Sequence, residues 1–79
     1  MKPTKGIVAE FPEIEREFVN RYEAYKKKKS VRNLAGLAIY WGKWSTYKNV
    51  FELESKLSEQ ETTEIYFTIT EHHKDLLIY

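Results

Sequence analysis

The apolar side chains around residues 12–29 recur three or four positions apart, a spacing that places them on one face of an α-helix. The stripe consists of Phe11, Ile14, Phe18, Val19, Tyr22 and Tyr25. Pro12 suits the first turn of such a helix, where its missing N–H would have no intrahelical partner. Lys26 to Lys29 suit its end, because cations are stabilised at the negative end of the helix dipole. The sequence therefore predicts an amphipathic helix over residues 12–29.

The stretch that follows fits two patterns. As a helix that begins at Val31 with Ser30 as its cap, it collects on one face Leu34, Leu37, Ala38, Trp41 and Trp44. Gly36 and Gly42 weaken this prediction, since each costs about 1 kcal/mol relative to Ala inside a helix. The competing interpretation is a buried strand over residues 34–41 that turns at Gly42-Lys43. We favour the helix.

Residues 49–61 leave the choice between helix and strand open. Asn49 and Glu52 have the spacing of a capping box, which favours a helix through the Glu-, Lys- and Gln-rich residues that follow. In a strand, the same segment would turn Phe51, Leu53 and Leu57 toward a core and its charged residues toward water. Neither pattern outweighs the other.

The C-terminal residues alternate in a way that is typical of a β-strand. Over residues 64–70, Ile65, Phe67 and Ile69 would point inward, and the intervening positions outward. The polar residues 71–75 then suit a turn, and residues 76–79 a short antiparallel partner. The chain is thus predicted to be one α+β domain over residues 1–79, with N-terminal amphipathic helices packed on a small C-terminal antiparallel β-sheet or hairpin.

The composition agrees with a single folded domain and narrows its setting. The chain has 79 residues, of which 42% are hydrophobic and 32% charged, as in globular proteins. It has no cysteine, which excludes disulfides and thiolate chemistry and suits a reducing compartment. It also has no run of 18 apolar residues and no secretory signal. We therefore expect a cytoplasmic protein without a membrane partner.

Residues that could carry catalysis are present but not arranged in a recognisable pattern. The candidates are Ser30, Ser45, Ser55, Ser58, His72 and His73. Adjacent histidines point in different directions, and their spacing to Glu71 and Asp75 matches no usual zinc pattern. No glycine-rich phosphate loop is visible. We expect a protein that is not an enzyme and that holds no cofactor and no metal.

Charge is distributed unevenly along the chain. Residues 1–49 carry 11 Lys or Arg against 5 Glu, whereas residues 50–79 carry 2 Lys against 7 Asp or Glu. The halves could pair with each other, or the basic half could attract a polyanion. Interleaved lysines and rings form a common platform for nucleic acid, and the candidate residues for it are Lys26, Lys27, Lys28, Lys29, Arg32, Lys43 and Lys48.

The predicted order of helices followed by a hairpin resembles a winged-helix domain, and residues 68–77 (TITEHHKDLL) resemble the end of its wing. This resemblance implies a recognition helix in the major groove of DNA and a hairpin that touches phosphate.

Three hypotheses about function follow. The first is a small regulatory or inhibitory protein that binds a protein partner stoichiometrically. Large rings next to an arginine are efficient interface anchors, and the candidate residues are Arg32, Tyr40, Trp41, Trp44 and Tyr47. The second is a nucleic-acid-binding regulator that uses the basic residues named above. The third is a structural homodimer that sets the basic half of one protomer against the acidic half of the other.

Overall fold

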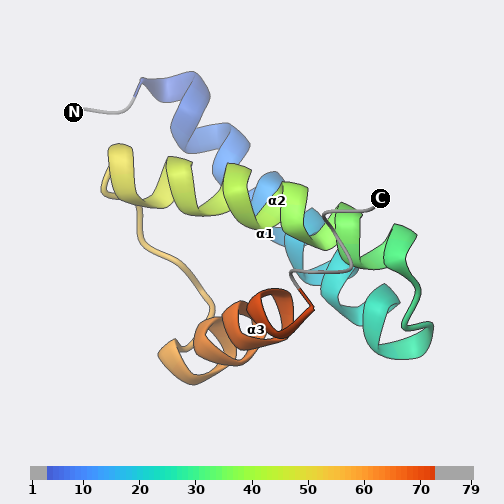
Figure 1. The fold of residues 1–79 in the computed structure, drawn as a ribbon. Helices are drawn as coiled ribbons and strands as arrows, with labels where there is room; N and C mark the ends of the chain where they lie inside the picture. The colour runs from blue at the N-terminus through green and yellow to red at the C-terminus, as the bar shows by residue number, and fades with distance from the viewer. Residues whose placement is uncertain (1–3, 73–79) are drawn as a thin grey trace.

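The computed structural model describes residues 4–72, which form three α-helices and contain no strand (Figure 1). Helix α1 spans Lys5–Lys27, α2 spans Val31–Val50 and α3 spans Glu59–Glu71. The predicted α+β class is therefore wrong, because residues 64–70, expected to be the first strand of the sheet, are helical. The resemblance to a winged-helix domain loses its basis for the same reason, since the residues described, up to residue 72, form no hairpin.

Helix α1 confirms the predicted amphipathic helix but begins earlier. Thr4 caps it, with its Oγ1 accepting a hydrogen bond from the Ile7 N–H at 3.2 Å. Pro12 consequently lies in the helix interior and not in the first turn as predicted. A proline there leaves the carbonyl four residues earlier without its hydrogen bond, and the exposure of Pro12 leaves room for water.

Helix α2 confirms the helix that we favoured over a strand. Ser30 is its cap, and the Ser30 Oγ accepts a hydrogen bond from the Asn33 N–H at 3.2 Å. The helix runs antiparallel to α1, so that its C-terminal end lies beside the N-terminal part of α1 (Figure 1). This pair forms the most extensive helix contact in the described part of the chain.

Residues 49–61, for which the sequence did not decide between helix and strand, form mostly neither. Asn49 lies in the last turn of α2, and residues 51–58 form an extended connection to α3. Glu52 adopts a left-handed backbone with φ 52°, which turns the chain away from α2 and rules out the capping box expected between Asn49 and Glu52.

Helix α3 replaces the predicted strand over residues 64–70. Ser58 and Glu61 form a complete capping box, in which each side chain bonds the other residue's backbone N–H. Ile65 and Ile69 stand four positions apart, so they share a helical face as well as a strand face. Of the predicted turn and return strand, residues 73–79 lie outside the described part of the chain.

The core lies mainly between α1 and α2, and α3 closes it with Ile65. Its buried members are Phe11, Ile14, Phe18, Tyr25, Leu34, Leu37, Trp44 and Ile65. The Trp44 ring stacks on Phe18 with their centroids 4.9 Å apart, a geometry that adds to the free energy gained by burying both rings. Within residues 4–72, no helix is both long and apolar enough to cross a membrane.

Candidate functional site

A buried carboxylate on α1 is hydrogen-bonded both to α2 and to the connection between α2 and α3. Glu15 of α1 is only 7% exposed. Its carboxylate accepts hydrogen bonds from the Trp44 Nε1–H at 2.9 Å, the Ser55 hydroxyl at 2.5 Å and the Lys56 backbone N–H at 2.9 Å. A buried charge is tolerated when it is hydrogen-bonded in this way. Glu15 therefore fixes the connection to α3 against α1 and α2, and thereby sets the position of α3.

The rings predicted to form one binding surface do not lie on one surface. Trp44 is only 1% exposed and belongs to the core. Tyr40 is half-buried on the flank next to α1, where the Arg21 guanidinium carbon lies 5.3 Å from its ring centroid. Tyr47 is half-buried seven positions further along the same flank and packs edge-on against Phe51 at 5.8 Å. The remaining predicted ring, Trp41, lies on the flank next to α3.

Trp41 begins a row of rings that reaches from the core to the surface. Its centroid lies 5.8 Å from Phe18 and 5.7 Å from Trp44 on the core side. On the outer side it lies 5.6 Å from Tyr66, whose ring lies 6.1 Å from Phe67. Tyr66 is 47% and Phe67 60% exposed. We call these three residues, Trp41, Tyr66 and Phe67, the ring face.

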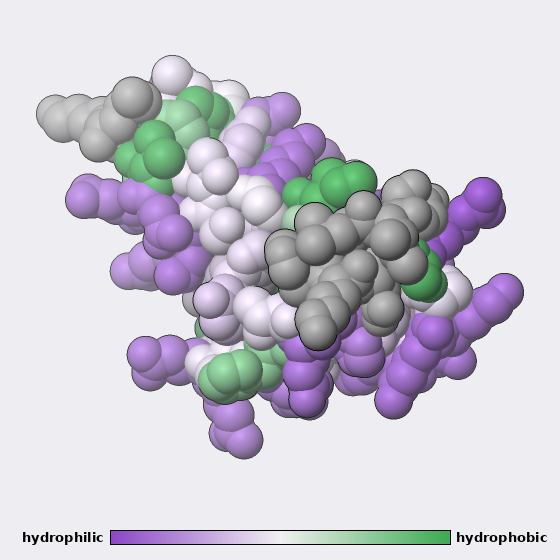
Figure 2. All heavy atoms as spheres, viewed as in Figure 1, coloured by the Kyte–Doolittle hydropathy of each residue, from purple (hydrophilic) through white to green (hydrophobic). Residues whose placement is uncertain are grey.

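The surroundings of the ring face are acidic. Helix α3 contains four glutamates and neither lysine nor arginine. A shallow depression of about 540 Å³ on its outer side is lined by Glu59, Gln60, Thr63, Glu64 and Phe67. Figure 2 shows that hydrophobic residues reach the surface in separate patches among hydrophilic ones, and one such patch lies over α3. Two carboxylates thus lie in the depression beside Phe67.

Sequence reasoning missed Tyr66 and Phe67 as candidates and placed Phe67 in the core. On a strand, residues 65 and 67 point the same way, but on a helix they lie about 200° apart. Phe67 therefore faces water because Ile65 faces the core. The serine and glutamate three positions apart at residues 58 and 61 were the available signal for a helix.

The predicted nucleic-acid-binding residues fall into two groups. Lys27, Lys28 and Lys29 are exposed at the turn between α1 and α2, beside Lys26 and the exposed Arg32. The other two lie elsewhere on the molecule. Lys43 borders a depression of about 190 Å³ that is also lined by Glu10, Glu13 and Glu17, and the Lys48 Nζ lies 5.7 Å from the Trp44 ring centroid. Within residues 4–72, no freely exposed Tyr, Trp or Phe ring lies among these cations, as the basic aromatic platform required.

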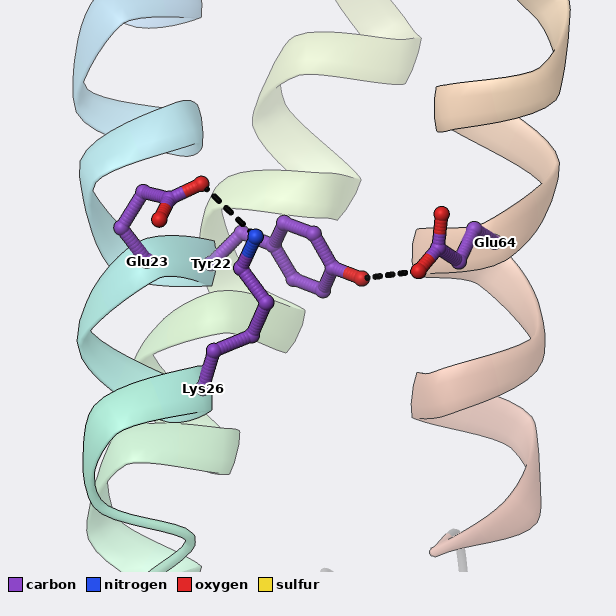
Figure 3. Close-up of polar contacts among 4 residues, drawn as sticks. All are labelled: Tyr22, Glu23, Lys26 and Glu64. Atoms are coloured by element: carbon purple, nitrogen blue, oxygen red, sulfur yellow. Dashed lines mark hydrogen bonds and ion pairs between the residues drawn. The ribbon is translucent and has the colours of Figure 1, made fainter.

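A polar contact also links α1 to α3. The Tyr22 hydroxyl donates a hydrogen bond to Glu64 Oε1 at 3.1 Å, and Lys26 forms an ion pair with Glu23 at 2.9 Å (Figure 3). Burial away from water is the largest cause that raises the pKa of Tyr22, and the hydrogen bond to Glu64 is the second. The hydrogen bond with Glu23 raises the pKa of Lys26. The protonated forms of Tyr22 and Lys26 therefore stabilise the fold more than their deprotonated forms do.

The raised pKa of Tyr22 predicts how Tyr22→Phe changes stability with pH. Because the folded pKa lies above the ordinary value of 10.0, the contribution of the hydroxyl is complete below pH 10 and is lost as the pH rises through the folded pKa. We expect Tyr22→Phe to be less stable than wild type at pH 8 and the difference to shrink above pH 10. Urea titrations across this range measure it, and a difference that stays constant with pH would contradict the assignment.

The serines and the described histidine have structural contacts. Ser30 and Ser58 cap α2 and α3, and Ser55 binds Glu15. Ser45 donates to the Gly42 carbonyl at 3.3 Å, and the His72 ring lies 6.2 Å from the Tyr25 ring. Within residues 4–72, no three His, Asp or Glu side chains gather closely enough to hold a metal ion.

The structure thus defines a small helical bundle with an exposed row of rings. Comparison with known protein families, curated proteins and solved structures found no match.

Proposed function

We propose that this chain acts as a stoichiometric binding protein that regulates or inhibits a protein partner, which docks on the ring face. The observation that carries the proposal is the exposure of Phe67 and Tyr66, at 60% and 47%, on a helix whose inner side is anchored in the core. Adjacent exposed rings leave apolar area in water that a partner can cover.

The contacts of the ring face favour tight binding. Tyr66 is held against Trp41, which in turn packs on Phe18 and Trp44. Rings that are already fixed lose little conformational entropy when a partner covers them. Aromatic residues in such positions commonly contribute most of the binding free energy of an interface.

The charge around the rings specifies the chemistry of the partner. Glu59 and Glu64 border the depression beside Phe67. Glu64 also accepts the Tyr22 hydrogen bond and lies near Lys26, but α3 itself contains no lysine or arginine. A matching surface therefore offers an apolar pocket for Phe67 and a lysine or arginine at its rim, which would enter the depression. The same carboxylates would repel the phosphates of a nucleic acid, so this face suits a protein.

Affinity capture with three forms of the chain tests the proposal. Phe67→Ser removes the most exposed ring. Ile39→Ser is the matched control, because Ile39 is 69% exposed and lies about 200° around α2 from Trp41. We expect a protein that wild type and Ile39→Ser retain in a one-to-one complex and that Phe67→Ser does not retain.

Two results would overturn the proposal. One is that Phe67→Ser and Ile39→Ser retain the same proteins as wild type. The other is that sedimentation shows the purified wild-type chain to be a dimer that Phe67→Ser converts to a monomer, since the ring face would then be the interface between two copies of this chain.

A further inference from the structure

The turn between α1 and α2 concentrates positive charge that the described part of the chain does not neutralise. Lys26 to Lys29 are consecutive and exposed, and Arg32 is exposed in the first turn of α2. Among residues 4–72, the one ion pair joins Lys26 to Glu23. Four cations, those of Lys27, Lys28, Lys29 and Arg32, are therefore without a carboxylate partner there. We call these four residues the basic turn.

The basic turn is held in a defined conformation by Asn33. Its Nδ2 donates hydrogen bonds to the carbonyls of Lys28 at 2.9 Å and Ala24 at 3.4 Å, at the C-terminal end of α1. Its backbone N–H donates to the Ser30 hydroxyl, which caps α2. The Ser30 N–H donates to the Lys28 carbonyl at 2.9 Å. These bonds fix the backbone that carries the four cations, so the spacing of their Cα atoms is set before any ligand arrives.

The residue types of the basic turn fit phosphates better than a protein surface. Three of the four cations are lysines, which are depleted in protein interfaces because their ammonium groups are strongly hydrated. An anionic membrane is also a poor match, since binding in its interface needs a broad apolar face beside the cations. Of the exposed large hydrophobic residues, only Val31 lies in this turn.

We propose that the basic turn binds the phosphate backbone of nucleic acid without recognising base sequence. Among residues 4–72, the tyrosine rings near the turn are not free to stack on bases, because Tyr25 is buried and Tyr22 is bonded to Glu64. Stacking of bases on rings is the interaction that favours single strands, so a site without it can bind double-stranded DNA.

Glu64 and Glu71 share a groove with Lys26 and Lys29. Because these carboxylates repel phosphates, the phosphates approach from the end of the bundle. Figure 2 shows hydrophilic side chains projecting from this end. The inference stands independently of the ring face.

Fluorescence anisotropy with a short labelled DNA duplex tests the inference. Four phosphate contacts predict that log K falls with log salt with a slope of about −4, which is a loss of roughly 100-fold in affinity between about 50 and 200 mM salt. The triple variant Lys27→Gln, Lys28→Gln, Lys29→Gln should reduce the slope to about −1. A duplex of different sequence should bind wild type equally well.

The matched control is Lys5→Gln, Lys43→Gln, Lys56→Gln, which removes the same net charge from exposed positions outside the turn. We expect it to keep the wild-type slope, and far-UV circular dichroism to show that both triple variants remain helical. Three results would overturn the inference. These are no binding to duplex in low salt, equal losses in the two triple variants, and binding to vesicles of anionic lipid without binding to duplex.

Discussion

Replacing Glu15 with alanine is expected to lower the free energy of unfolding by about 3 kcal/mol or more. The substitution leaves the Trp44 Nε1–H, the Ser55 hydroxyl and the Lys56 N–H without their acceptor. A buried donor that loses its partner costs about 1–3 kcal/mol. Because Glu15 is the residue that ties the connection to α1 and α2, the loss should also weaken the docking of α3.

Urea and thermal unfolding measure this effect, with Glu15→Gln as the control. The glutamine keeps an amide oxygen that accepts a hydrogen bond, so it should cost less than alanine. For a domain of this size, about 3 kcal/mol corresponds to a decrease in Tm of about 12 °C or more. If Glu15→Ala unfolds within about 0.5 kcal/mol of wild type, as a surface substitution would, the carboxylate does not organise the fold.

Trp44→Ala should be destabilising to a similar degree, by about 3–5 kcal/mol, as for other buried large rings. The substitution removes the ring that stacks on Phe18 and packs beside Phe11. It also removes one of the three donors to Glu15. Trp44→Phe keeps most of the ring area and loses the donor, so it should lie between wild type and alanine.

Chemical unfolding of the single and double variants at Trp44 and Glu15 measures both the cost and the coupling. Because the two side chains share a hydrogen bond, the double alanine variant should cost less than the sum of the single variants. Strict additivity would show that the hydrogen bond contributes nothing. A Trp44→Ala protein as stable as wild type would contradict the position of Trp44 in the core.

The second helix could only be favoured over a strand, but the first could be predicted from the sequence because its apolar stripe has a single period. Phe11, Ile14 and Phe18 fit only a helix. The third could not be separated from a strand by periodicity, since Ile65, Phe67 and Ile69 alternate and also include an i, i+4 pair. The abundance of threonine and aromatic residues in this segment favoured a strand. The capping box at its start and the helical bundle that receives Ile65 outweigh these preferences.

The candidate site could be predicted only in part. Sequence patterns place Trp41 and Trp44 on one side of α2, but they do not show which ring a third helix will cover. The structure buries Trp44 between α1 and α2 and brings Trp41 to Tyr66. Glu15 is charged, which favours a solvent-facing position, yet it lies four positions after Phe11, within the apolar stripe. Its burial depends on donors 29 to 41 residues away along the chain, which no local pattern reveals.

The most direct test of the central claim, that the ring face binds a protein partner, is a calorimetric titration of the captured partner with wild type, Phe67→Ser and Ile39→Ser. We predict one-to-one binding, an unchanged affinity for Ile39→Ser, and an affinity for Phe67→Ser that is weaker by about 30-fold or more, the effect of losing an interface anchor worth about 2 kcal/mol. Equal affinities for all three proteins would contradict the claim.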